Sequence, residues 1–166
     1  VEGFAVGEGH GDVYAKKYLV DNMGELKKQG VNTLYVGHFR NDDYQKLIGD
    51  FMKSKESKLK GPLGTAIDAM DVSHNQSAGP YNLRGLLESA KKHGINVVGI
   101  DDIQAKGSLE QRVGFMNTFA EGVIKNDPQR NGGKFVILAG AAHNNTHPGK
   151  VQGVPGLSQL LNVPAV

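Results

Sequence analysis

The sequence FVILAGAAH, residues 135–143, is the stretch that decides the fold. An apolar run without alternating polar residues is typical of a strand that is buried on both faces of a sheet. INVVGI at residues 95–100 has the same character, and VNTLYVGHF at residues 31–39 is rich in β-branched and aromatic side chains. Helical patterns separate these strands along the chain. The sequence therefore predicts an α/β fold with a mostly parallel central sheet and helices on both faces.

Capping signals and apolar periodicity place the helices between the strands. Ser108 and Gln111 form the pattern of a capping box, and Gly30 is a helix stop. We expect strands at residues 2–8, 31–39, 95–100 and 134–138, and a short last strand at 163–166. We expect helices at residues 13–29, through 44–51, at 80–93 and 108–125, and a short one at 154–161. Residues 54–79 combine Lys, Ser, Gly and Pro with a weak helical pattern, so we expect an insertion or a lid there.

Length and composition describe one globular domain. The chain has 166 residues and a mass of 17.8 kDa, enough to bury a core, so we expect residues 1–166 to form a single domain. A net charge of +2 is too small to indicate nucleic-acid binding. The chain has no cysteine, which excludes disulfides, thiolate zinc sites and cysteine nucleophiles.

No apolar run approaches the roughly 20 residues that a helix needs to span a bilayer, so we expect a soluble domain without a transmembrane segment. The sequence starts at Val1, without an initiator methionine. We therefore also expect it to be a piece of a longer protein, with neighbouring domains as partners.

Polar and charged side chains follow each expected strand. They are Glu8 and His10 after the first strand, His38 and Arg40 after the second, Asp101 and Asp102 after the third, and His143 after the fourth. Because ligands of parallel sheets bind beyond the carboxyl ends of the strands, these residues are the candidates for a site. Three glycines surround Glu8 and His10, which leaves room for a ligand to approach. We expect Glu8, His10 and His143 to share one site.

His38 and Arg112 each have more than one interpretation. His38 fits a site residue as well as a polar side chain satisfied by backbone, whereas we expect His74 and His93 to be structural. Arg112 shares a predicted apolar stripe with Phe115, Met116 and Phe119. It would bind an anionic partner in the site, or it would extend to solvent or pair with Asp101 or Asp102.

Three short motifs in order carry a resemblance to known proteins: Gly7-Glu8-Gly9-His10, Arg112 with Met116, and Gly140-Ala141-Ala142-His143. Together they resemble the superfamily that joins erythromycin esterase-like enzymes, haem-binding ChaN-like proteins, TraB proteins and Tiki metalloproteases. A related domain occurs in large bacterial toxins of the Pasteurella multocida toxin type. The resemblance implies a hydrolase domain of a bacterial toxin or effector that is secreted or delivered into a host cell.

Two functional hypotheses follow. In the first, Glu8 or His10 takes a proton from water, or Glu8, His10 and His143 hold a divalent metal such as Mn, Co or Zn; Arg40 or Arg112 then stabilises the developing oxyanion. The catalytic candidates are therefore Glu8, His10, Arg40, Arg112 and His143, with an unknown substrate. In the second, the chain is a non-catalytic module that binds a ligand such as haem or acts as a scaffold. A phosphate-binding loop is disfavoured, because residues 7–11 lack the Gly-x-Gly-x-x-Gly spacing and contain an acid.

Overall fold

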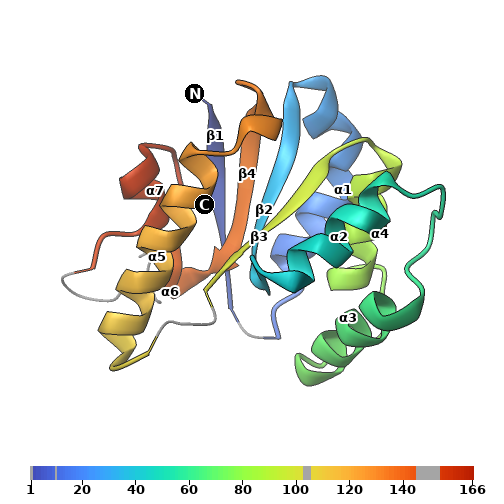
Figure 1. Cartoon of the computed structure of the whole chain (residues 1–166), viewed down its shortest axis with the longest axis horizontal. Helices are drawn as coiled ribbons and strands as arrows, with labels where there is room; N and C mark the ends of the chain where they lie inside the picture. Colours follow the sequence, from blue (N-terminus) through green and yellow to red (C-terminus); the bar gives the residue numbers. More distant parts are fainter. Residues whose placement is uncertain (1, 10, 103–105, 145–153) are drawn as a thin grey trace.

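Within the part of the chain that the structure describes, four parallel strands form a central sheet (Figure 1). The computed structural model describes residues 2–9, 11–102, 106–144 and 154–166. The strands lie in the order β1-β4-β2-β3. Their bounds are β1 (Gly3–Glu8), β2 (Val31–Arg40), β3 (Asn96–Asp101) and β4 (Lys134–Gly140).

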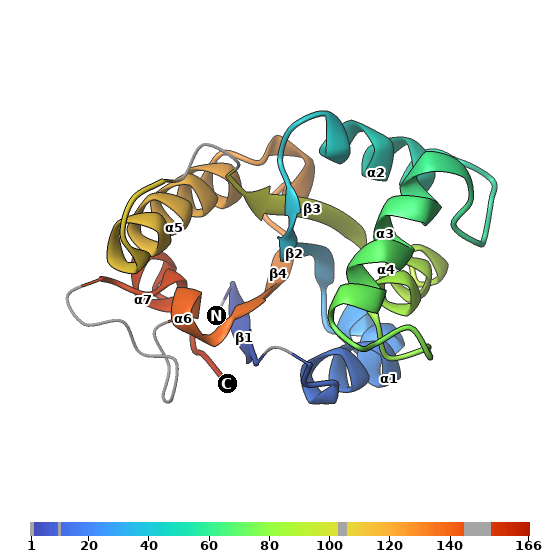
Figure 2. The ribbon, with the colours of Figure 1, turned by 90° about the horizontal axis from the view of Figure 1, so that it is seen from below.

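Helices cover both faces of this sheet, and Figure 2 shows the two layers on opposite sides of the strands. The first layer consists of α1 (Tyr14–Lys28), α2 (Asp43–Lys53), α3 (Gly61–Ser73) and α4 (Leu83–Lys92). The second layer contains α5 (Leu109–Lys125) and α7 (Leu157–Leu161). The single turn η1 (Pro128–Arg130) precedes β4, and the short α6 (Ala141–Asn144) follows β4 directly. The expected α/β fold, with a parallel sheet between helices, is confirmed.

The central strand β4 explains why its sequence is apolar throughout. Val136 and Leu138 belong to the core on the side of α1 to α4, whereas Phe135, Ile137 and Ala139 belong to the core on the side of α5 and α7. Each of these five side chains is at most 2% exposed. Burying one such large apolar side chain stabilises a fold by roughly 1.5–3 kcal/mol. The run at 135–139 therefore joins both halves of the core.

Residues 54–79, the expected insertion or lid, contain α3. Its Leu63 and Ile67 side chains are buried in the same core cluster as those of α1 and α4. The interpretation of this segment as an insertion stays a prediction. The following helix begins later than its sequence indicates, at Leu83, because the Asn82 side chain caps it by accepting a hydrogen bond from the Gly85 amide at 2.8 Å.

The C-terminal residues lie along the outer edge of β1. The Ala5 amide donates to the Pro164 carbonyl, the Val166 amide donates to the Ala5 carbonyl, and Ala165 forms an isolated parallel bridge with Ala5. The expected last strand at 163–166 is thus reduced to a single bridge. It still satisfies backbone groups at an edge that would otherwise be open for pairing with another chain.

A bulge in β2 shapes the end of the sheet where His38 lies. The pairing of β2 with β3 shifts register between Val36 and Arg40. Opposite this irregularity, side chains bind the backbone of Gly99: its amide donates to Gln45 Oε1 at 2.6 Å and its carbonyl accepts from Asn41 Nδ2 at 2.7 Å. Bulges often redirect side chains next to functional sites.

We expect Gly99→Ala to destabilise the fold. A Cβ atom at this position would lie 2.5 Å from the Phe39 carbonyl oxygen and 2.8 Å from that of Arg40, so the backbone would have to shift. The expected loss is about 1–3 kcal/mol in the free energy of unfolding, measured by urea titration. Gly49→Ala on α2 is the matched control: a Cβ meets nothing within 4 Å there, and alanine should stabilise the helix by roughly 0.5–1 kcal/mol. Equal stability of the two variants would contradict this.

Candidate functional site

The carboxyl ends of the strands bring the candidate residues to one edge of the sheet. Glu8 ends β1 and is paired with Gly140, the last residue of β4. His143 follows on α6, and Arg40 ends β2 beside Asp101, the last residue of β3. The sequence prediction that these residues share an edge therefore matches the register of the sheet. His10 lies outside the described residues.

Glu8 is a buried carboxylate whose two oxygens both have cationic or hydrogen-bonding partners. Oε2 lies 2.7 Å from Nζ of Lys16 on α1, and Oε1 lies 2.8 Å from Nε2 of His38 on β2. Burial raises the pKa of Glu8, but the hydrogen bonds and charges of His38 and Lys16 together outweigh burial. The pKa of Glu8 therefore lies below its ordinary value of 4.5, and the carboxylate is ionised at neutral pH.

Lys16 is a fully buried cation that the sequence analysis missed. Its side chain is 0% exposed and lies on the same buried face of α1 as Leu19, Met23 and Leu26. A lysine that continues an apolar stripe at helical spacing is a sequence signal for a buried ion pair, because an isolated charge is too costly to bury. Lys16 also acts electrostatically on Asp71 of α3, which is buried and accepts hydrogen bonds from the first amides of α4.

His38, which the sequence left undecided, contacts Glu8 at the candidate site. Its Nε2 faces the ionised Glu8, so Nε2 carries the hydrogen of this contact. Within the described part of the chain, its other ring nitrogen, Nδ1, is buried without a hydrogen-bond partner. The ring of His74 from the end of α3 packs edge-on against it, with 5.7 Å between the ring centroids. Glu8 therefore fixes the orientation of His38.

His143 is half-buried and lies on α6, which packs against α5, α7 and the ends of β1 and β4. Its Nδ1 is 3.0 Å from Oδ1 of Asn117, a residue of α5. Burial lowers the pKa of His143 below its ordinary value of 6.5, and the positive charge of a protonated His38 lowers it further. At neutral pH His143 is therefore an uncharged imidazole that is able to accept a proton. His143 also lines a small cavity together with Gly37, the residue before His38.

Asn117 is a second residue of the candidate site that sequence reasoning missed. It lies on the buried face of α5 with Val113, Ala120 and Ile124. The predicted stripe through Arg112 is wrong, because Arg112 is exposed and the Phe115 side chain is 58% exposed. The helix face that packs against the sheet lies one residue further along the chain and carries an asparagine in its centre.

The two arginine candidates are both exposed at the surface. Arg40 Nε lies 3.4 Å from Oδ2 of Asp42, and the Arg40 charge acts on Asp101. Burial raises the pKa of Asp101, while the charges of Arg40 and His38 oppose that rise. Arg112 lies in the first turns of α5. Roles for Arg40 and Arg112 in catalysis stay predictions.

The donors in the described ranges do not fit a metal ion. No group of three His, Cys, Asp or Glu side chains is arranged there to hold one. Both oxygens of Glu8 are already engaged, one of them by the Lys16 ammonium, which would repel a divalent cation at the same carboxylate. His10, the third member of the expected metal set, lies outside the described residues.

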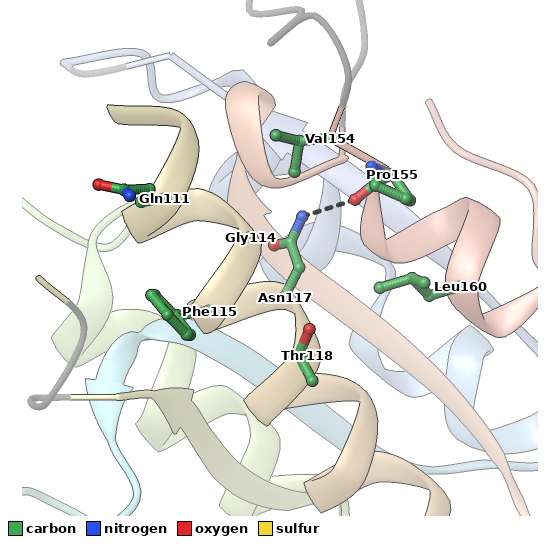
Figure 3. A pocket seen from close by; sticks show the side chains of 8 residues that line it. All are labelled: Gln111, Gly114, Phe115, Asn117, Thr118, Val154, Pro155 and Leu160. Carbon is green, nitrogen blue, oxygen red and sulfur yellow. Dashed lines mark hydrogen bonds between the residues drawn. The ribbon is translucent and has the colours of Figure 1, made fainter. Parts of the chain in front are cut away.

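A mostly apolar groove of about 310 Å³ lies between α5 and the segment that leads into α7 (Figure 3). Phe115, Val154, Pro155 and Leu160 provide most of its apolar lining. Asn117 also contributes to the lining and donates from Nδ2 to the Pro155 carbonyl at 3.0 Å, drawn as a dashed line in Figure 3. One amide side chain thus contacts both the groove and His143.

Comparisons with known proteins find that the chain is similar to segments of bacterial toxins. It is 32% identical over 176 residues to a multifunctional-autoprocessing repeats-in-toxin of Vibrio vulnificus, covering 99% of the chain and 3% of that toxin. The crystal structure of RRSP, an effector domain of the MARTX toxin of Vibrio vulnificus, matches with a TM-score of 0.73 and 30% identity, over 99% of the chain and 32% of the crystallised protein. The chain is thus similar to a small segment of a much larger multidomain toxin.

The C-terminal region of Pasteurella multocida toxin, described as having a thiol-protease-like catalytic triad, has the same fold. Its TM-score is 0.73 at 22% identity, over 99% of this chain and 22% of that one. This chain has no cysteine and so cannot form a thiol triad. No protein-family model matches the chain, and the wider resemblance to esterase-like, ChaN-like, TraB and Tiki proteins stays a prediction. Among the described residues, no helix is both long and apolar enough to cross a membrane.

Removing the cation from the buried pair should destabilise the protein strongly. Lys16→Met leaves the ionised Glu8 carboxylate buried without its ammonium partner, and we expect a loss of about 3–5 kcal/mol in the free energy of unfolding. The adjacent Lys17 is the matched control: its side chain is half exposed and pairs with Asp21 at 2.8 Å, so Lys17→Met should change stability little. Urea titration of both variants checks this, and a small effect of Lys16→Met would contradict the buried pair.

Stability should also fall with acidification because of His143. Its pKa is lowered in the folded state and close to 6.5 in the unfolded state, so the unfolded state binds more protons between these values. The free energy of unfolding is therefore lost as the pH falls from 6.5 through the folded pKa. Between about pH 7.5 and 5.5, wild-type stability should fall more steeply than that of His143→Gln, and equal slopes would contradict the assignment.

Proposed function

We propose that the chain is a hydrolase domain of a bacterial toxin effector that acts inside a host cell. The observation that carries this proposal is a buried carboxylate, Glu8, at the same carboxyl edge of the sheet as a half-buried histidine, His143. Glu8 is held by Lys16 and His38, and His143 lines the same small cavity as Gly37, the neighbour of His38 in β2. Titratable groups whose surroundings shift their pKa values, so that one is charged and the other uncharged at neutral pH, are typical of acid/base catalysis.

His143 is the residue best suited to take a proton from the attacking water. It is uncharged at neutral pH and lies at the end of β4, where ligands of parallel sheets bind. Glu8 is less suited to this role, because both of its oxygens are occupied and its pKa is lowered. In this proposal Glu8 orients His38 instead, and the proton that His143 takes from water then passes to the leaving group.

The remaining candidates complete the proposal at the same edge. Arg40 is an exposed cation beside Asp101, and Arg112 is exposed at the start of α5. Either guanidinium would stabilise an oxyanion that develops on the substrate. His10 follows Glu8 closely in the sequence and would assist in binding the water.

An attack by water is favoured over a covalent intermediate. The chain has no cysteine, and it lacks the Gly-x-Ser-x-Gly motif of a nucleophile elbow. We also propose that hydrolysis proceeds without a metal ion, since the Lys16 ammonium occupies the Glu8 oxygen that a metal would need.

The toxin relatives support the host-cell setting of this proposal. One similar segment belongs to a multifunctional-autoprocessing repeats-in-toxin of Vibrio vulnificus. The other relative, RRSP, is an effector domain of a MARTX toxin. The chain spans about a third of the crystallised RRSP protein, so the activity of a longer protein would depend on further segments.

Substitutions at the site should abolish hydrolysis. The purified chain is incubated with a eukaryotic cell lysate, and mass spectrometry measures hydrolysis products, including new protein N-termini. We expect His143→Ala and Glu8→Gln to reduce product formation by about 10²–10⁴-fold, because each removes a group that handles or orients a proton. His93→Ala is the control and should retain activity, because His93 lies at the end of α4, just before the amino end of β3 and away from the carboxyl edge of the sheet.

The same assay separates hydrolysis from a binding or scaffolding role and from metal catalysis. The proposal is supported if the wild-type chain forms products and His143→Ala does not, with its circular dichroism spectrum unchanged. Because Glu8→Gln leaves the Lys16 ammonium buried without its partner, loss of activity in that variant counts only if its circular dichroism spectrum is also unchanged. Treatment with EDTA should leave product formation unchanged. Full activity of His143→Ala would reject the proposed function, and loss of activity with EDTA that Zn²⁺ or Mn²⁺ restores would reject the metal-free route.

A further inference from the structure

Asn117 contacts His143 through both ends of its amide. Nδ2 donates to the backbone carbonyl of His143 and to that of Pro155, each at 3.0 Å, and Oδ1 lies 3.0 Å from the His143 ring nitrogen Nδ1. Asn117 is 1% exposed, so water does not compete for these bonds. Figure 3 shows the bond to Pro155 and the position of Asn117 on α5.

The two carbonyls determine which way the Asn117 amide is turned. A carbonyl oxygen only accepts hydrogen bonds, so the atom that faces the carbonyls of His143 and Pro155 must be the NH₂ group. The reversed amide would place Oδ1 against two carbonyl oxygens with no hydrogen between them. The orientation with Oδ1 toward the His143 ring is therefore the one that the network allows.

This orientation also determines where the hydrogen of the neutral His143 ring lies. Oδ1 of an asparagine accepts hydrogen bonds and cannot donate them, so its contact at 3.0 Å requires a hydrogen on Nδ1 of His143. The neutral ring carries one hydrogen, and Nε2 is then left with the free lone pair. A histidine without such a partner would not be held in this tautomer.

We propose that Asn117 is a positioning residue that holds His143 as the Nδ1–H tautomer and so makes Nε2 the atom that accepts a proton from water. The inference rests on the proposed function for its catalytic part. It assigns the base to one atom and gives a reason why an amide lies on the otherwise apolar buried face of α5. It also explains why α6 holds a fixed place at the sheet edge, since the same amide binds the His143 backbone.

The lowered pKa of His143 is consistent with this assignment. Burial and the charge of His38 both favour the uncharged ring. A neutral acceptor such as an amide also stabilises an uncharged imidazole without adding a negative charge, which would raise the pKa of the histidine. Asparagine is therefore better suited here than aspartate for keeping His143 uncharged.

Nuclear magnetic resonance of the ¹⁵N-labelled histidine rings tests the assignment directly. Long-range ¹H–¹⁵N correlation distinguishes a protonated from an unprotonated ring nitrogen, and His143→Gln identifies the His143 signals. We expect wild-type His143 to have a hydrogen on Nδ1 and none on Nε2 at neutral pH. In Asn117→Ala the ring should shift toward the Nε2–H form, and hydrolysis in the lysate assay should fall by about 10–100-fold.

Asn126→Ala is the matched control. Asn126 is an exposed asparagine at the end of the same helix, and its side chain donates to the Gly122 carbonyl at 2.9 Å. It should change neither the tautomer nor the activity. A wild-type spectrum with the hydrogen on Nε2 would overturn the inference, even if Asn117→Ala does not fold. An unchanged tautomer in a folded Asn117→Ala would also overturn it.

The outcomes also separate this inference from the proposed function. If His143→Ala abolishes hydrolysis and wild-type His143 is the Nε2–H tautomer, the proposed function stands and the role of Asn117 is rejected. If wild-type His143 is the Nδ1–H tautomer but His143→Ala keeps full activity, both the proposed function and the catalytic role of Asn117 are rejected.

Discussion

The buried contact between the Glu8 carboxylate and the Lys16 ammonium is the interaction on which the candidate site depends. Each of these charges would cost several kcal/mol to bury alone. Together, at 2.7 Å and with His38 on the second carboxylate oxygen, they form a satisfied group at the end of β1. The pair fixes α1 against the first strand and keeps a negative charge at the sheet edge, which in turn orients His38.

The parallel sheet brings this charged group and His143 to the same place. Because β4 lies between β1 and β2, Glu8 and His38 come from strands on either side of it, and β4 itself leads into His143. Lys16 reaches the edge from the helix layer of α1 to α4, whereas Asn117 reaches it from α5 on the opposite face. The site is therefore built from both helix layers, and neither layer alone would position its residues.

Much of this arrangement was predictable from the sequence, and the reasons are local. The apolar runs at 95–100 and 134–138 indicated buried parallel strands, and strand ends then pointed to Glu8 and His143. The sequence analysis did not identify Lys16 and Asn117, because a single polar residue on an apolar helix stripe is easily overlooked. Each is nevertheless detectable, since each replaces an apolar residue at regular helical spacing. The predicted Arg112 stripe was displaced by one position, which turns a helix face by about 100°.

Other features depend on tertiary structure and no local pattern reveals them. The bulge in β2 lies opposite Gly99, whose backbone binds the side chains of Gln45 and Asn41. Only the assembled fold places His38 against Glu8, which is why its sequence context fitted two interpretations.

The pKa of Glu8 tests the central claim most directly. A titration followed by ¹³C nuclear magnetic resonance of the side-chain carboxyl groups, with Glu8→Gln to assign the signal, reports this value in the folded protein. If Lys16 and His38 hold the carboxylate as described, the pKa of Glu8 lies below its ordinary value of 4.5. A pKa above 4.5 would mean that burial dominates, that Glu8 lacks its two partners, and that the site is not assembled as proposed.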